Sequence, residues 1–183
     1  MSCASGTDAL MILLMAKGIG YGDAVFTTNF SFFATTEVIT LLGATPIFVD
    51  IDEKTFNLNP EKLESEINRV KKERNLKPKA IISVDLFGLL ADYEKISHIA
   101  EKHNLFLLED AAQSFGATYK DKRSCSFGDG AATSFYPAKP LGCYGDGGAI
   151  FLNDFDLVDK CKSIRVHGQG INKYDNIQIG INS

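Results

Sequence analysis

The sequence lacks any strongly basic stretch. Its 183 residues carry 19 lysines and arginines against 23 aspartates and glutamates, a formal net charge of −4. The most basic segment, 69–79, contains Glu73 among its lysines and arginines, a pattern typical of the exposed face of a helix. We therefore expect neither nucleic acid nor an anionic membrane surface as a partner.

Cysteines and histidines are few and widely spaced. The three histidines are too scattered for a metal site, and the cysteines include no CxxC pair. No metal is therefore predicted, and reduced thiols in a cytoplasmic protein are the simplest interpretation. The four cysteines are Cys3, Cys125, Cys143 and Cys161.

Long hydrophobic runs and several common catalytic motifs are also missing. The apolar run within residues 1–18 contains Asp8, has no basic leader and is far shorter than the about 20 residues that span a bilayer. Neither a signal peptide nor a membrane span is predicted. The chain has no GxGxxG, Walker-type, GxSxG or HExxH motif. Dinucleotide dehydrogenases, P-loop ATPases, serine hydrolases and zincins are therefore not indicated.

The composition, 45% hydrophobic and 23% charged, is that of one globular domain. Short apolar segments alternate with amphipathic ones, which predicts an α/β fold with a mostly parallel sheet covered by helices on both faces. We expect segment 45–50, TPIFVD, to be a buried strand, and 116–130 to contain turns and a short exposed ribbon. The other expected strands are 24–28, 79–84, 104–109, 131–136 and 148–153, and the expected helices are 9–16, 32–42, 60–74, 92–103 and 154–165.

Lys139 stands in an unusual setting for a lysine. It follows an apolar run, lies between Pro137 and Pro140 and precedes several glycines, which predicts a rigid, closely packed loop between two strands. A lysine desolvated in such a loop can act as a nucleophile toward a carbonyl group. An ordinary turn lysine accounts for the local pattern equally well.

Two further features are candidates for a ligand site. Asp110 is expected at the carboxyl end of a parallel strand, where α/β folds bind ligands, and the alternative is a helix cap or a turn residue. The tetrapeptide Ser5–Asp8, SGTD, begins an apolar helix whose free N–H groups suit a phosphate. A plain helix cap explains this tetrapeptide as well.

Four motifs in order resemble one enzyme family. SGTDAL, NFSFFATT, EDAAQSFGA and TSFYPAKPLGCYGDGGA look like the pyridoxal-phosphate-dependent sugar aminotransferases of the DegT/DnrJ/EryC1/StrS group. The resemblance covers essentially the whole chain and implies the large domain of the aspartate aminotransferase-like, fold type I enzymes. The run from Glu109 to Phe151 is most similar to enzymes that aminate C3 of a UDP-linked 2-acetamido-3-oxo-uronic acid.

The resemblance also implies roles for individual residues. Lys139 would form the Schiff base with pyridoxal phosphate and then move protons, a position where related dehydratases carry histidine. Asp110 would pair with the pyridine nitrogen, Gln113 would bind the ring hydroxyl, and Phe32 would stack on the ring. The phosphate would be bound by a further set of residues: Gly6, Thr7, Ser134 and, from a partner subunit, Asn182.

The same resemblance implies a homodimer with a shared active site. It also implies that residues 1–183 are a cofactor-binding large domain without the family's N-terminal arm and C-terminal small domain. The expected reaction moves an amino group, with glutamate as donor, to a nucleotide-linked keto sugar for surface polysaccharide. The alternatives are a truncated domain that binds cofactor or dimerises without turnover, and another reaction that starts from a lysine Schiff base. The roles of Tyr136 and His167 stay open.

Overall fold

The computed structural model describes residues 1–172 and 174–183. Within these residues, one seven-stranded sheet has the strand order β1-β9-β8-β5-β4-β2-β3. Strands β2, β3, β4, β5 and β8 run parallel, whereas β9 and β1 complete the sheet in antiparallel pairs. The strands are β1 (Ser2–Cys3), β2 (Asp23–Thr27), β3 (Thr45–Phe48), β4 (Lys77–Val84), β5 (Phe106–Asp110), β8 (Gly130–Ser134) and β9 (Gly148–Phe151).

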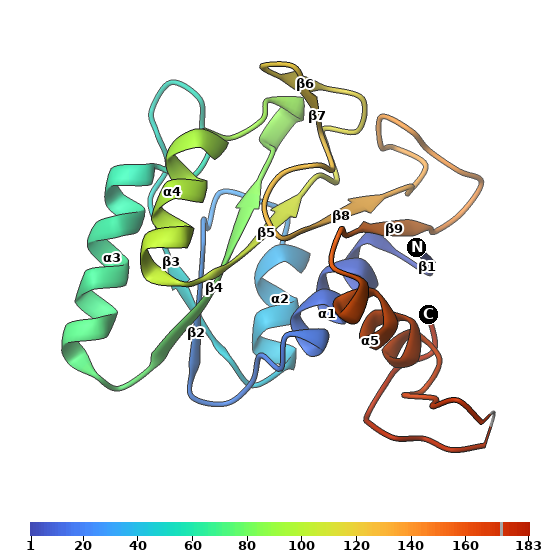
Figure 1. Cartoon of the computed structure of the whole chain (residues 1–183). Coiled ribbons are helices and arrows are strands. Elements are labelled where there is room, and N and C mark those ends of the chain that lie inside the picture. The colour runs from blue at the N-terminus through green and yellow to red at the C-terminus, as the bar shows by residue number, and fades with distance from the viewer. Residues whose placement is uncertain (173) are drawn as a thin grey trace.

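Helices cover both faces of this sheet (Figure 1). One face packs against α1, α2 and α5, and the opposite face packs against α3 and α4. A 3-10 turn, η1 (Leu86–Gly88), follows β4, and a small hairpin, β6 (Thr118–Tyr119) and β7 (Lys122–Arg123), precedes β8. The helices are α1 (Gly6–Ala16), α2 (Ala34–Leu41), α3 (Pro60–Glu73), α4 (Tyr93–His103) and α5 (Phe155–Arg165).

The central strands explain why two helical layers form. Neighbouring side chains of a strand point to opposite faces, and β4 and β5 are apolar at nearly every position. Ile82 and Leu108 thus join the core under α1, while Ile81 and Leu107 join the core under α4. The predicted α/β fold with a mostly parallel, helix-covered sheet is confirmed, as is the short exposed ribbon. None of the helices that the structure describes is both long and apolar enough to cross a membrane.

The expectation of a buried strand at residues 45–50 is wrong. Among the described residues, strand β3 forms the edge of the sheet, pairs with β2 alone and is half-buried, with Phe48 49% exposed. Pro46 has no N–H to donate to a further strand, so an edge position suits this sequence better than a central one. The apolar, β-branched composition alone does not reveal this.

Both chain ends lie beside β9 and α5 (Figure 1). The Met1 amino group donates to the Ile150 carbonyl at 2.9 Å, and the Ala4 N–H donates to the Ser183 hydroxyl at 2.8 Å. At the same corner, the start of α1 lies directly on β9. A Cβ added to Gly148 would lie 2.3 Å from the Ser5 carbonyl oxygen and 2.8 Å from the Gly6 nitrogen.

We expect Gly148→Ala to destabilise the protein by about 1–3 kcal/mol, because its methyl group would push the backbone at the start of α1 away from β9. Urea unfolding monitored by circular dichroism measures this. Gly145→Ala is the matched control, since a Cβ there meets no atom within 4 Å. Its effect should stay within about 0.5 kcal/mol. Equal stabilities of the two variants would contradict the close contact.

Candidate active site

A pocket of about 540 Å³ opens at the carboxyl edge of the parallel strands. Because β5 and β8 pair in parallel, their last residues, Asp110 and Ser134, lie at this same edge. The N-terminus of α1 and the loop after β8 complete the wall. Of the residues predicted to bind cofactor, those that line the pocket are Gly6, Thr7, Phe32, Asp110, Gln113, Ser134 and Lys139.

The N-terminus of α1 presents two unbonded N–H groups to this pocket. The Ser5 hydroxyl accepts the Asp8 N–H at 3.0 Å, so the helix is capped, as the plain interpretation expected. The N–H groups of Gly6 and Thr7 have no hydrogen-bond partner among the described residues. Capping and anion binding are therefore compatible here, since the cap leaves the two outermost donors for a ligand.

Ser134 lies beside the N-terminus of α1 and, with the N–H groups of Gly6 and Thr7, forms a cradle for a ligand. A Cβ added to Gly6 would lie 2.6 Å from the Ser134 Cβ, so only glycine permits this approach. The Ser134 Oγ accepts the Tyr136 N–H at 3.2 Å, and its own proton stays available for donation. Two N–H groups and one hydroxyl thus converge on a space suited to an anion.

Asp110 is a buried carboxylate, 5% exposed, with its own hydrogen-bond donors. The Thr35 hydroxyl donates to Oδ2 at 2.8 Å, and the Ala112 N–H donates to Oδ1 at 3.2 Å. Burial raises the pKa of Asp110, while Thr35, Ala112 and the positive charge of Lys139 oppose that rise. These three groups favour the ionised form in a site that otherwise disfavours charge.

Thr35 is a site residue that the sequence reasoning missed. It is 1% exposed on α2, and the Ser31 hydroxyl lies 3.0 Å from its Oγ1. Because Thr35 donates its proton to Asp110, Ser31 donates to Thr35. The sequence offers no signal for this contact beyond the position of Thr35 near Phe32, because β5 and α2 are 75 residues apart.

The loop that carries Lys139 differs from its expected packing. Its turns are internally tight, since a Cβ on Gly142 would lie 2.5 Å from the Pro137 carbonyl oxygen. Most of segment 136–146 is nevertheless exposed, and Lys139 itself is half-buried. The expectation of a closely packed loop was therefore wrong, because no described segment covers it. The Lys139 Nζ lies 6.0 Å from the centre of the Phe32 ring.

Gln113 has one end of its side chain already fixed. Its Oε1 accepts the Phe87 N–H at 2.7 Å, across the pocket edge from η1. The amide NH₂ is thus the end that remains to donate to a ligand oxygen.

Two of the three remaining candidates lie outside this pocket. Tyr136 lines it, whereas His167 is exposed and does not. Asn182 is also exposed, forms an isolated bridge with Val166, and is not brought to the pocket of its own chain.

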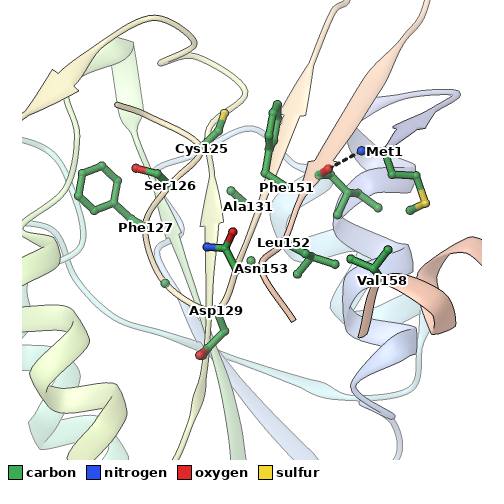
Figure 2. A pocket seen from close by; sticks show the side chains of 13 residues that line it. Met1, Cys125, Ser126, Phe127, Asp129, Ala131, Phe151, Leu152, Asn153 and Val158 are labelled. Atoms are coloured by element: carbon green, nitrogen blue, oxygen red, sulfur yellow. Dashed lines mark hydrogen bonds between the residues drawn. The ribbon is translucent and has the colours of Figure 1, made fainter. Parts of the chain in front are cut away.

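A separate hollow of about 300 Å³ lies between Met1 and the segment that leads into β8 (Figure 2). Figure 2 shows Cys125, Ser126 and Phe127 on one side and Leu152 and Val158 on the other. It shares no lining residue with the Lys139 pocket. Among the described residues, no cluster of histidine, cysteine, aspartate or glutamate could hold a metal ion.

A protein-family comparison matches residues 1–183 to the DegT/DnrJ/EryC1/StrS aminotransferase family. The chain belongs to this family. Among curated relatives, it is 52% identical over 183 residues to UDP-2-acetamido-2-deoxy-3-oxo-D-glucuronate aminotransferase of Pseudomonas aeruginosa, covering 100% of the chain and 49% of that protein. It is 42% identical to UDP-N-acetyl-3-dehydro-alpha-D-glucosamine 3-aminotransferase of Acidithiobacillus ferrooxidans, covering 100% of the chain and 47% of that protein.

Solved structures agree with this membership. A DegT DnrJ EryC1 StrS aminotransferase from Brucella abortus matches with a TM-score of 0.98 and 55% identity, over 100% of this chain and 49% of that one. NtdA from Bacillus subtilis, with bound cofactor PMP, matches with a TM-score of 0.89 and 35% identity, over 100% and 40% of the respective chains. The chain thus spans about half the length of the relatives it matches.

Pyridoxal phosphate is the cofactor of this aminotransferase family. The pocket residues fit that group chemically. The Gly6–Ser134 cradle offers hydrogen-bond donors for a phosphate, the buried Asp110 offers a carboxylate for a ring nitrogen, and Lys139 offers an amine for an aldehyde.

We expect Thr35→Val to raise the pKa of Asp110 further, because the valine cannot donate to Oδ2. At neutral pH the variant should lose about 1–3 kcal/mol of stability, the cost of a hydrogen bond to a charged group. Since the folded-state pKa of Asp110 already lies above its ordinary value, this loss should shrink as pH falls and both states become protonated.

Carbon-13 NMR titration of the Asp110 carboxyl group and urea unfolding at several pH values measure both effects. Thr35→Ser is the matched control, because it keeps the hydroxyl. If valine and serine variants leave the Asp110 titration identical, the hydrogen bond does not favour the ionised carboxylate.

Proposed function

We propose that residues 1–183 form the cofactor-binding large domain of an aminotransferase that acts on a nucleotide-linked keto sugar. The observation that carries the proposal is one pocket that joins an amine, Lys139, to a buried carboxylate, Asp110, and to the open end of α1. An anion cradle, an acid for a ring nitrogen and a nucleophilic amine are what pyridoxal phosphate chemistry requires of its protein.

Five residues of the chain would contact the phosphate, the ring hydroxyl and the ring face of the cofactor. The N–H groups of Gly6 and Thr7 and the Ser134 hydroxyl would donate to its phosphate, where the dipole of α1 favours negative charge. The Gln113 amide would donate to the ring hydroxyl, because its oxygen is engaged by Phe87. Stacking by the exposed ring of Phe32, beside Lys139, would restrict tilt of the cofactor ring.

Two groups would handle protons. The bound cofactor supplies an aldehyde that captures amines and a ring that withdraws electrons from the reacting carbon. Asp110 would keep a proton on the ring nitrogen, since Thr35 and Ala112 donate to its carboxyl group and favour its ionised form, which in turn favours a positive partner. The Lys139 Nζ would take a proton from the substrate carbon as general base and, as general acid, would deliver it to the cofactor carbon that carries the aldehyde.

The substrate class comes from the relatives. The names of both curated relatives describe aminotransferases of UDP-linked 3-oxo sugars, so a UDP-linked 3-oxo sugar is the acceptor that we propose. Glutamate is the proposed amino donor, and the aminated sugar is proposed to be used for surface polysaccharide. We propose that the reaction takes place in the cytoplasm. The four cysteines, all without disulfides, fit a reducing compartment.

We further propose a homodimer in which Asn182 serves the partner's site. Its exposed position, away from the pocket of its own chain, is compatible with this role. A degenerate domain without turnover is less favoured, because all the residues that one chain is predicted to supply to the cofactor line the pocket. No observation favours a different reaction from the same lysine.

We expect Lys139→Ala to lower the rate of amino transfer by at least about 100-fold, since it removes both the nucleophile and the general base. The measurement follows the visible absorbance of the cofactor-loaded protein after glutamate is added, and then after the UDP-linked 3-oxo sugar is added. Lys160→Ala, an exposed lysine of α5, is the control and should keep the wild-type rate. An alanine variant at position 139 with full activity would contradict the proposed function.

A further inference from the structure

A pair of buried acids, Asp85 and Glu109, lies behind the candidate active site. Glu109 precedes Asp110 in β5, so the two side chains point to opposite faces of the sheet. Asp110 faces the pocket and α2, whereas Glu109 pairs in register with Ser83 and faces α4. There it meets Asp85, the residue that follows β4, and both acids are 0% exposed.

The Glu109 carboxyl group anchors the segment that precedes β8. Its Oε1 accepts the Cys125 N–H at 2.7 Å, and its Oε2 accepts the Phe127 N–H at 2.9 Å. This segment borders the hollow of Figure 2. Its Phe127 ring stacks on Tyr93 of α4 at 4.5 Å between centroids.

Asp85 connects three other parts of the chain. Its Oδ1 accepts the Ala91 N–H at 3.2 Å and the Tyr93 hydroxyl at 2.8 Å. Its Oδ2 accepts the Ser114 hydroxyl at 2.7 Å, and Ser124 in turn lies 2.8 Å from Ser114. One carboxylate thus fixes the loop 85–91 and the segment after β5.

The two buried acids lie on the same face of the sheet, because Glu109 pairs in register with Ser83 and Asp85 comes two residues after Ser83. Two neighbouring carboxyl groups can hydrogen-bond to each other only if they keep one proton between them. The titratable groups that face the pair are Tyr93 from α4 and Cys125 from the segment before β8. Within the described residues, no lysine, arginine or histidine pairs with either acid. Burial raises the pKa of both acids, and the charge of Asp85 raises that of Glu109 further. Asp85 accepts more donors, so the proton resides on Glu109.

This pair is linked to the pocket through Gln113. The hydrogen bond from the Phe87 N–H to Gln113 joins loop 85–91 to the segment after β5. Asp85 binds both of these segments, because it accepts the Ala91 N–H in the loop and the Ser114 hydroxyl in the segment after β5. Phe87 has a left-handed backbone, with φ of 57°, which is unfavourable for a non-glycine residue and needs support from its surroundings.

We propose that Asp85 and Glu109 share one buried proton, and that Asp85 in this pair is a positioning residue that sets the Phe87–Gln113 hydrogen bond at the edge of the cofactor pocket. The link to the cofactor depends on the role proposed above for Gln113. The shared proton and the Phe87–Gln113 contact do not.

The pair makes the protein less stable at alkaline pH. A folded-state pKa of Glu109 above its ordinary value means that the folded chain holds a proton that the unfolded chain has released. Stability therefore falls as pH rises between those two values. Once Glu109 ionises, two buried carboxylates repel each other, and loop 85–91 loses its fixed position.

Asp85→Asn is the decisive variant. The amide oxygen can still accept from Ala91 and Tyr93, while its NH₂ can donate to Ser114 and to an ionised Glu109. We expect carbon-13 NMR to show that Glu109 titrates above neutral pH in the wild type, and about one pH unit or more lower in the variant. Amide exchange at Phe87, expressed as a protection factor, should fall by about tenfold as wild-type Glu109 ionises, and should stay constant in the variant.

Both readouts use the full chain without cofactor, so they do not depend on the proposed function. The proposed function is tested separately, by measuring whether the same wild-type protein binds pyridoxal phosphate. Ser83→Ala is the matched control, because its buried hydroxyl has no hydrogen-bond partner among the described residues and its loss should leave the Glu109 titration unchanged. Glu109 already ionised at neutral pH in the wild type would overturn the shared proton, even if Asp85→Asn does not fold. Protection at Phe87 that does not change across the titration would overturn the positioning role.

Discussion

The parallel pairing of β5 with β8 is the constraint on which the rest of the structure depends. It brings the ends of two strands, Asp110 and Ser134, to one edge of the sheet, and the loop after β8 then carries Lys139 to the same place. The close contact of Gly6 with Ser134 fixes the start of α1 against that edge. These two arrangements bring together Gly6, Thr7, Asp110, Ser134 and Lys139, whereas Phe32 reaches the pocket from the segment before α2.

The chemistry of this edge depends on how buried carboxyl groups are stabilised. Burial works against charge at Asp85, Glu109 and Asp110 alike, but their partners differ. Asp110 receives a hydroxyl, an N–H group and the charge of Lys139, which favour an ionised acid suited to a protonated ring nitrogen. Asp85 and Glu109 have each other, so a proton replaces the missing cation. The end of β5 thus carries, on the pocket face, an acid whose ionised form its neighbours favour and, on the opposite face, an acid that shares a proton with Asp85.

Much of the fold could be predicted from the sequence, because the strands of a parallel sheet are continuously apolar and the helices between them are amphipathic. The edge position of β3 could not, since composition does not say which strands a strand pairs with. The pocket residues were found through motifs that resemble a family, whereas the local patterns around Lys139 and Asp110 left ordinary explanations open. Thr35 and the Asp85–Glu109 contact were missed, because each joins segments far apart in the sequence through side-chain geometry alone.

The central claim is that Lys139 is the residue that binds pyridoxal phosphate covalently. The most direct test is to load the purified chain with the cofactor, reduce it with borohydride and locate the modified residue by mass spectrometry. The account predicts one stable label on Lys139, with visible absorbance of the bound cofactor before reduction. No label, or labels spread over exposed lysines, would contradict it.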